Sequence, residues 1–115
     1  MSYVYHRNTP AYGGTTTIIT EDASAYVMIT VFNGKEDIAV IHDLVVLKDR
    51  RGEGLGSRIL EEAVEEAKRM GADVVRLSVE QKSWLEEWYK RHGFQETGEV
   101  EDLGKVFNVL ERPLK

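Results

Sequence analysis

The chain has 115 residues, no cysteine and a formal net charge of −5, which fits one compact domain and excludes disulfides and thiolate metal sites. The acidic balance argues against a general affinity for nucleic acid or for an anionic membrane surface. No apolar run approaches the roughly 20 residues that span a bilayer, and no signal-peptide pattern opens the sequence. We therefore expect a single domain over residues 1–115 with a cytoplasmic location.

The first half of the chain has the residue pattern of antiparallel β-strands. Residues 15–20 are almost all β-branched, and residues 24–32 alternate and are rich in Tyr, Val, Ile and Thr. The Asn-Gly pair at 33–34 is a strong hairpin signal, and residues 38–47 form the next apolar run. The pattern predicts three strands in a meander, preceded by a short strand near residues 3–6.

The second half contains two helical patterns. Apolar residues recur at helical spacing over 59–70, and Gly71 ends that helix. A capping box formed by Ser83 and Glu86 opens the second helix, which ends at Gly93.

Three further strands are expected near residues 73–79, 94–100 and 105–110. The order of these elements predicts an α+β fold of the three-layer α/β/α type. Its sheet should be mixed and mostly antiparallel, with about six to seven strands and two main helices.

A glycine-rich turn joins the strand at 38–47 to the first helix. Gly52, Gly54 and Gly56 leave backbone N–H groups exposed at the helix N-terminus, where the partial positive charge favours an anion. Without side chains the backbone can wrap closely around phosphate oxygens, and Arg50 and Arg51 add charge at the rim. The pattern predicts a site for a small phosphate-bearing anion, with a solvated basic turn as the alternative.

Two common phosphate-binding motifs do not fit this turn. A nucleotide-hydrolase loop needs Gly-Lys-Ser/Thr after four spacer residues, and no lysine occupies that place. A dinucleotide-binding fingerprint needs a third glycine where Ser57 or Ile59 stands, and parallel strands before the helix.

The spacing Arg51-x-x-Gly54-x-Gly56, after Leu44-x-Val46 on a strand and before an amphipathic helix, closely resembles the acetyl-CoA-binding motif of the GNAT N-acetyltransferase superfamily. The resemblance covers roughly residues 37–94, about half of the chain, and the flanking strand order agrees with a GNAT-like fold. It implies acetyl-CoA as cosubstrate, with its pyrophosphate on the amides of the turn and its pantetheine paired to the strand like an added strand. The cofactor-binding residues implied in this way are Leu44, Val45, Val46, Arg50, Arg51, Gly52, Glu53, Gly54, Leu55, Gly56 and Ser57.

A second match, Tyr89-x-x-x-Gly93-Phe94, looks like the end of a later helix in the same family. The resemblance implies that Tyr89 protonates the leaving thiolate of coenzyme A, and a phenol with a pKa near 10 is a suitable acid. Packing of Tyr89 within the helical stripe is the alternative. Family members often carry Asn and Ala where this chain has Lys82 and Leu85, so no coenzyme contact is carried over to those two positions.

Other polar and aromatic residues have two interpretations each. His42 and Asp43 interrupt an apolar strand and should face opposite sides, one of them toward the helix-covered core. Each is a candidate for acceptor binding or for the general base, as is Glu80, and a satisfied structural role is the alternative. Trp84 and Trp88 are interpreted as packing or a dimer contact. The histidines show no ligand spacing, so we expect no metal.

The N-terminal region is short for the family that the chain resembles. Members usually place two helices between the first and second strands, whereas about ten residues, Pro10 among them, separate Tyr5 from Thr15. We expect an open acceptor side, or one completed by a second subunit, which favours an exposed protein or peptide amine as the acceptor. A homodimer is left open, and neither nucleic acid nor membrane is expected as a partner.

Three functions are compatible with these patterns. The first is an N-acetyltransferase that moves an acetyl group from acetyl-CoA to a primary amine by direct attack, with a backbone N–H near Val46 polarising the carbonyl. The second is a catalytically silent coenzyme A-binding sensor or partner-binding module. The third is an interaction domain whose basic turn binds nothing.

Overall fold

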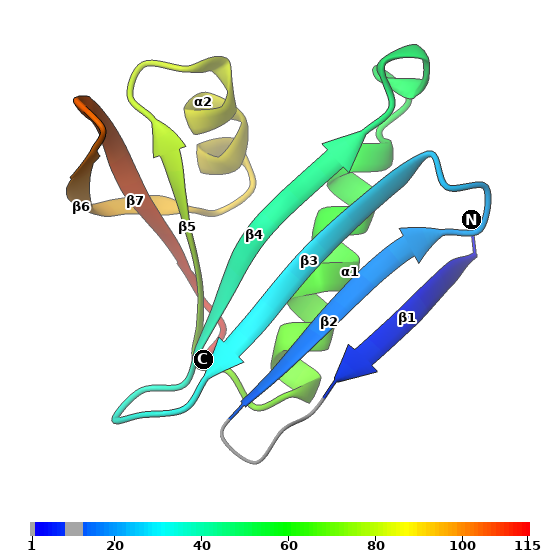
Figure 1. Cartoon of the computed structure of the whole chain (residues 1–115), viewed down its shortest axis with the longest axis horizontal. Helices are drawn as coiled ribbons and strands as arrows, with labels where there is room; N and C mark the ends of the chain where they lie inside the picture. Colours follow the sequence, from blue (N-terminus) through cyan, green and yellow to red (C-terminus); the bar gives the residue numbers. More distant parts are fainter. Residues whose placement is uncertain (1, 9–12) are drawn as a thin grey trace.

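The computed structural model describes residues 2–8 and 13–115, which form one seven-stranded sheet with the order β1-β2-β3-β4-β5-β7-β6 (Figure 1). Neighbouring strands are antiparallel except β4 and β5, which are parallel. The strands are β1 (Tyr3–Asn8), β2 (Gly13–Thr20), β3 (Ala25–Phe32), β4 (Ile38–Val46), β5 (Val74–Glu80), β6 (Gln95–Asp102) and β7 (Lys105–Pro113). The helices are α1 (Leu55–Arg69) and α2 (Trp84–Arg91), with a single 3-10 turn, η1 (Lys48–Arg50), before α1. The mixed, mostly antiparallel sheet with two main helices is thereby confirmed.

Two of the three expected layers are present in the described residues, because both helices lie on the same face of the sheet. Figure 1 shows α1 passing behind β2, β3 and β4. The start of α1 is hydrogen-bonded to the end of α2 through Ser57 and His92, 2.8 Å apart. The expected short connection between the first two strands falls on residues 9–12, Pro10 included, which lie outside the described residues.

The core lies between this helical layer and the sheet. α1 buries an apolar stripe against Val27, Ile29 and Val31 of β3, and each large side chain stabilises the fold by about 2 kcal/mol on full burial. The buried apolar residues of α1 are Leu55, Ile59, Leu60, Ala63, Val64 and Ala67.

No helix among the described residues is long and apolar enough to cross a bilayer.

A β-bulge interrupts the pairing of β4 with β3. Met28 pairs with Asp43, but the next residue, Ile29, pairs with Ile41, so His42 is the extra residue. The expected placement of His42 and Asp43 on opposite faces is therefore wrong. Both side chains are exposed on the face away from the helices, because the bulge resets the alternation of the strand.

Beyond the bulge, β4 and β5 diverge. Their parallel pairing covers Ile38–Val40 and Val74–Arg76, and Figure 1 shows the two strands separating above this point. The edge of β4 that would face β5 carries no strand partner there, whereas its other edge remains paired with β3 through Val46. The result is an opening between the two strands, bordered by the glycine-rich turn and by α2.

A buried carboxylate fastens β1 and β2 to α1. The Glu66 side chain is 2% exposed, and its two oxygens accept hydrogen bonds from Arg7 at 2.8 and 3.0 Å, from Arg69 at 2.9 Å and from the Thr16 hydroxyl at 2.8 Å. The hydrogen bonds from Arg69 are the main cause that holds the pKa of Glu66 well below its ordinary value of 4.5; burial opposes them, and those from Arg7 and Thr16 add to them.

Replacing Glu66 by Gln should lower the unfolding free energy by about 2 kcal/mol at neutral pH, because two guanidinium groups lose their carboxylate partner. The pKa of Glu66 is lower in the folded than in the unfolded chain. Its contribution is therefore present above about pH 4.5 and is lost as the pH falls through the folded-state pKa. Chemical denaturation of wild type and Glu66→Gln across this pH range measures the difference, which should shrink in acid.

The matched control for this substitution is Glu65→Gln. Glu65 is the neighbouring residue, is 67% exposed and pairs with Lys68 at 3.3 Å, so its loss should leave stability unchanged. Equal stabilities of the two variants at every pH would contradict the anchoring role of Glu66.

Candidate functional site

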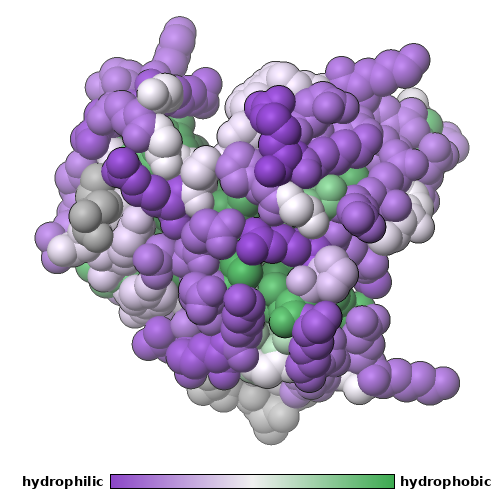
Figure 2. All heavy atoms as spheres, turned by 180° about the vertical axis from the view of Figure 1, so that it is seen from behind, coloured by the Kyte–Doolittle hydropathy of each residue, from purple (hydrophilic) through white to green (hydrophobic). Residues whose placement is uncertain are grey.

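A cavity of about 440 Å³ opens between the end of β4, the glycine-rich turn and α2. Figure 2 looks onto the helix-covered side of the molecule, where a notch in the upper edge marks this opening. Three segments line the cavity: β4 with Leu44, Val45 and Val46; the turn and the start of α1 with Arg50, Arg51, Gly52, Gly54, Leu55, Gly56 and Ser57; and α2 with Trp84, Leu85 and Trp88. The residues predicted from the sequence therefore include the β4 wall and the turn of this cavity, but not the wall formed by α2.

The backbone of the turn has the geometry of an anion site. Gly52 and Gly54 have φ angles of 87° and 77°, in the left-handed region that favours glycine, and Gly54 is the N-cap of α1 without a side-chain cap. The N–H groups of residues 52–57 donate to no acceptor among the described residues, whereas those of Arg50, Arg51 and Arg58 do. Six consecutive donors at a helix N-terminus thus remain available for a ligand.

The charged residues of the turn have different positions. Arg51 lines the cavity and donates from Nε to the Val46 carbonyl at 3.2 Å. Arg50 also lines it, but its guanidinium is paired with Asp22 at 2.8 Å and with Glu53 at 3.0 Å. Glu53 is the one predicted cofactor residue that is not among the lining residues, because its carboxylate turns toward Arg50.

The wall formed by α2 is a feature of the cavity that the sequence analysis missed. Trp88 faces the start of α1, where a Cβ added at Gly56 would lie 3.4 Å from its ring and 3.7 Å from Val46. Trp84 stands at the rim of the cavity and is 69% exposed. The signal was present in the sequence, because residues 84, 85 and 88 share one helical face, but it was interpreted as packing or a dimer contact.

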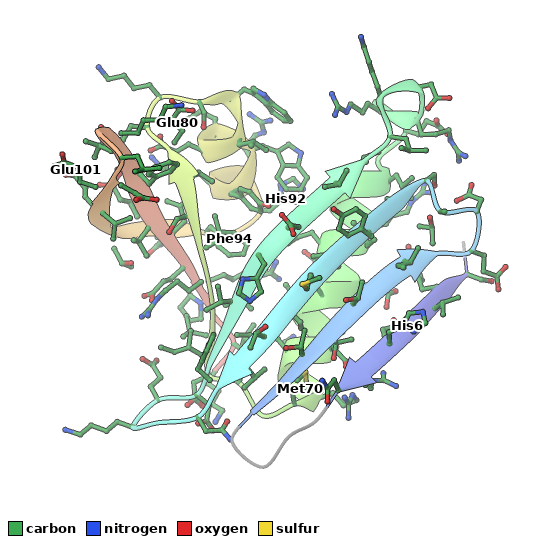
Figure 3. The ribbon with its side chains drawn as sticks, viewed as in Figure 1. His6, Met70, Glu80, His92, Phe94 and Glu101 are labelled. Carbon is green, nitrogen blue, oxygen red and sulfur yellow. The ribbon has the colours of Figure 1, made fainter. Side chains whose placement is uncertain are left out.

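A serine–histidine hydrogen bond joins two walls of the cavity. His92 Nδ1 lies 2.7 Å from the Trp88 carbonyl, which can only accept, so this nitrogen carries the proton. His92 Nε2 then accepts the hydrogen bond from the Ser57 hydroxyl at 2.8 Å. Figure 3 shows His92 near the lower end of α2, where β4 and β5 diverge. Sequence spacing gave no indication of this pair, since 35 residues separate its members.

Tyr89 lies behind this wall, outside the set of lining residues. Its ring is 6% exposed and makes edge-to-face contacts with Trp88 at 5.0 Å and Phe94 at 5.4 Å between centroids. Burial raises the pKa of Tyr89 to about 12. No protein partner within the described residues reaches its hydroxyl, and none of their polar side-chain atoms is both fully enclosed and unpaired, so this hydroxyl contacts open space.

The other candidate catalytic residues lie on the opposite face of the sheet. His42 is exposed at the bulge, with Nε2 2.8 Å from the Thr30 hydroxyl, and Asp43 is exposed beside it. Glu80, labelled in Figure 3, ends β5 and lies 4.0 Å from Lys105. The structure brings the predicted cofactor-binding residues other than Glu53 together around one cavity, whereas His42 and Asp43 border the β4–β5 opening from the uncovered face. Residues 2–8 and 13–115 contain no group of three His, Cys, Asp or Glu side chains arranged for a metal.

A family profile, a curated relative and several solved structures are similar to this chain. Residues 5–96 match the sequence profile of the acetyltransferase (GNAT) domain. An uncharacterized N-acetyltransferase of Methanocaldococcus jannaschii is 42% identical over 64 residues, which are 54% of this chain. The aligned part is 28% of that relative, so the chain spans only part of its length.

Solved structures share the fold. The NatC complex bound to Gag peptide and CoA superposes with a TM-score of 0.76 and 18% identity, over 88% of this chain and 71% of that one. A GNAT family acetyltransferase from Elizabethkingia anophelis with acetyl-CoA bound superposes with a TM-score of 0.69 and 12% identity, over 97% and 98% of the two chains. At these identities the likeness concerns the fold.

Replacing Gly56 by Val should weaken the binding of coenzyme A at least tenfold, about 1.4 kcal/mol. The new side chain would fill the gap between Trp88 and Val46 at the foot of the anion site, while the helical backbone at this position accepts any residue. Isothermal titration calorimetry with coenzyme A measures the affinity. Gly98→Val is the matched control, because a side chain on this β6 residue meets open space. Equal affinities of the two variants would contradict the assignment of the cavity.

Proposed function

Because the chain belongs to the GNAT acetyltransferase family, we propose that it binds acetyl-CoA in this cavity and transfers the acetyl group to a primary amine. The observation that carries the proposal is the row of free backbone N–H groups over residues 52–57, next to a cavity walled by β4 and α2. A diphosphate is the part of acetyl-CoA that needs such donors.

The residues around the cavity fit the cosubstrate. Its volume of about 440 Å³ lies within the usual range of ligand pockets. The amides of the turn and Arg51 would hold the pyrophosphate, and the free edge of β4 at Leu44–Val46 would receive the amides of pantetheine. Trp84 and Trp88 would exclude water from the opposite side. Acetyl-CoA, when bound, supplies the activated acyl group and a thiolate leaving group.

Tyr89 is proposed as the acid of the reaction. A pKa of about 12 keeps the phenol protonated at neutral pH, so a proton is available at its oxygen for the departing sulfur. Its hydroxyl has no protein partner within the described residues, which leaves it free to donate. Contacts of Trp88 and Phe94 with the Tyr89 ring fix the direction of this hydroxyl.

The acceptor is proposed to be an exposed amine, as in a protein or peptide. No helix in the described part of the chain covers the sheet face that carries His42 and Asp43, so a large acceptor can approach the β4–β5 opening from that side. Asp43 and His42 are suited to hold the cationic amine and to remove its proton. The NatC complex, whose structure holds a peptide and CoA, supports an acceptor of this class.

Replacing Tyr89 by Phe should lower kcat about 100-fold or more while the affinity for acetyl-CoA is nearly kept, because only the proton of the acid is removed. Thiol release with a panel of peptide and small amines measures turnover, and calorimetry measures binding. Tyr3→Phe, which removes the hydroxyl of a half-buried tyrosine on β1, is the matched control and should keep full activity.

The outcomes of this experiment separate the candidate functions. An unchanged rate in Tyr89→Phe would remove this residue from the mechanism and leave the cosubstrate site standing. Tight binding of acetyl-CoA by the wild type without thiol release for any amine would instead favour a catalytically silent coenzyme A-binding module. Absence of binding would contradict both.

A further inference from the structure

The serine–histidine pair that joins two walls of the cavity takes no part in the proton transfers described above. Ser57 lines the cavity in the first turn of α1, and its N–H is one of those without an acceptor among the described residues. His92 is the C-cap of α2 and does not line the cavity, so Ser57 lies between His92 and a bound ligand. The 2.8 Å hydrogen bond between them is therefore the contact through which His92 can act on a ligand.

The Ser57 hydroxyl has a single proton, which it donates to His92 in this structure. His92 Nδ1 donates to the Trp88 carbonyl at 2.7 Å, which leaves Nε2 as the acceptor. A diphosphate has only acceptor oxygens, so a hydrogen bond from the Ser57 hydroxyl to a phosphate would need the same proton. The hydroxyl can turn to a phosphate oxygen and keep its bond to His92 only if Nε2 carries a proton of its own and donates it to the Ser57 oxygen.

The charged groups around His92 are paired with one another or exposed. Glu61 of α1 accepts from Arg112 of β7 at 2.8 Å, and Arg112 also donates to the His92 carbonyl at 3.1 Å. On α2, Lys90 pairs with Glu86 at 3.1 Å. The other charged residues beside the pair are exposed: Arg58 on α1, and Glu87 and Arg91 on α2. In the described part of the chain no carboxylate contacts the imidazole, whose partners are a hydroxyl and a main-chain carbonyl, so an imidazolium has no anionic partner of its own.

We propose that Ser57 and His92 form a proton-linked contact to the diphosphate of the cosubstrate, an inference that rests on the proposed function. On binding, His92 takes up one proton from solvent at Nε2 and donates it to the Ser57 oxygen, while the Ser57 hydroxyl donates to a phosphate oxygen. The diphosphate supplies the anionic partner that the imidazolium lacks. The partial negative charge at the C-terminus of α2 favours the same cation. His92 is thus a positioning residue, because it acts on the ligand through Ser57.

The contact makes the affinity for the cosubstrate depend on pH. Histidine is the side chain whose charge ordinarily changes between about pH 5 and 8. Where His92 is neutral in the free protein and protonated in the complex, binding consumes a proton, so the affinity falls as the pH rises. Uptake of one proton limits this fall to about tenfold per pH unit.

Calorimetry with 3′-dephospho-CoA tests the proposal, because this ligand keeps the diphosphate and lacks the phosphomonoester, which itself titrates at about pH 6. Titrations in buffers of different ionisation enthalpy give the number of protons taken up. Wild type should take up more than about half a proton per ligand at about pH 7.5, and its affinity should fall about tenfold between pH 6 and 8. His92→Gln, whose side chain is polar but carries no charge, should take up none and bind with an affinity independent of pH. The matched control, His6→Gln, removes an exposed histidine of β1 and should behave as wild type.

Nitrogen-15 NMR of the imidazole rings reports the charge of His92 in the wild type itself, so the test does not depend on a variant that folds. The chain has three histidines, and the two glutamine variants assign the resonances of His92 and His6. Those of His92 should change from the neutral to the imidazolium form when 3′-dephospho-CoA is added at about pH 7.5.

The outcomes separate this inference from the proposed function. Binding without proton uptake, uptake that persists in His92→Gln or is lost in His6→Gln, or a neutral His92 in the complex would each overturn the inference and leave the cosubstrate site standing. Wild type that binds neither 3′-dephospho-CoA nor acetyl-CoA at any pH would overturn both.

Discussion

The divergence of β4 from β5 beyond Val40 is the constraint on which the rest of the site depends. A paired edge of β4 would close the sheet and leave no room between the glycine-rich turn and α2. Since the strands separate, β4 keeps one edge on β3 and exposes the other to a ligand. The chain enters α1 at the mouth of this opening, so the free amides of residues 52–57 and the free strand edge border the same cavity.

The walls of the cavity are held by the core rather than by the ligand. α1 is fixed by its apolar stripe and by Glu66, and its first turn meets α2 through Ser57 and His92. Trp88 contacts both this helix start and the ring of His92, 4.2 Å away between centroids. Because these contacts already fix the geometry of the donors, ligand binding should not carry the free-energy cost of ordering the site.

Features set by neighbouring residues could be predicted from the sequence, whereas features set by contacts between distant residues could not. The β-branched runs, the helical stripe and the N-cap at Ser83 are signals carried by neighbouring residues, and the structure contains each of them. The Ser83 hydroxyl accepts from the Glu86 amide as the capping box predicts, whereas the Glu86 carboxylate accepts from the Lys82 amide and not from that of Ser83. The bulge at His42 could not be predicted from the sequence. It depends on the register in which β4 pairs with β3, which is a contact between residues that are not neighbours in the chain. The role of Trp88 was missed for another reason: its helical spacing is visible in the sequence but fits packing equally well, and only its contact with the start of α1 separates the two interpretations.

An NMR titration of the backbone amides with coenzyme A tests most directly whether the glycine-rich turn binds the diphosphate. The largest ¹H and ¹⁵N shift changes should occur at residues 52–57, whose N–H groups have no acceptor within the described protein. Pantetheine, which lacks the pyrophosphate, should shift the amides of Leu44–Val46 and leave those of the turn unchanged. Saturating coenzyme A that shifts neither segment would contradict the central claim that these donors bind a diphosphate.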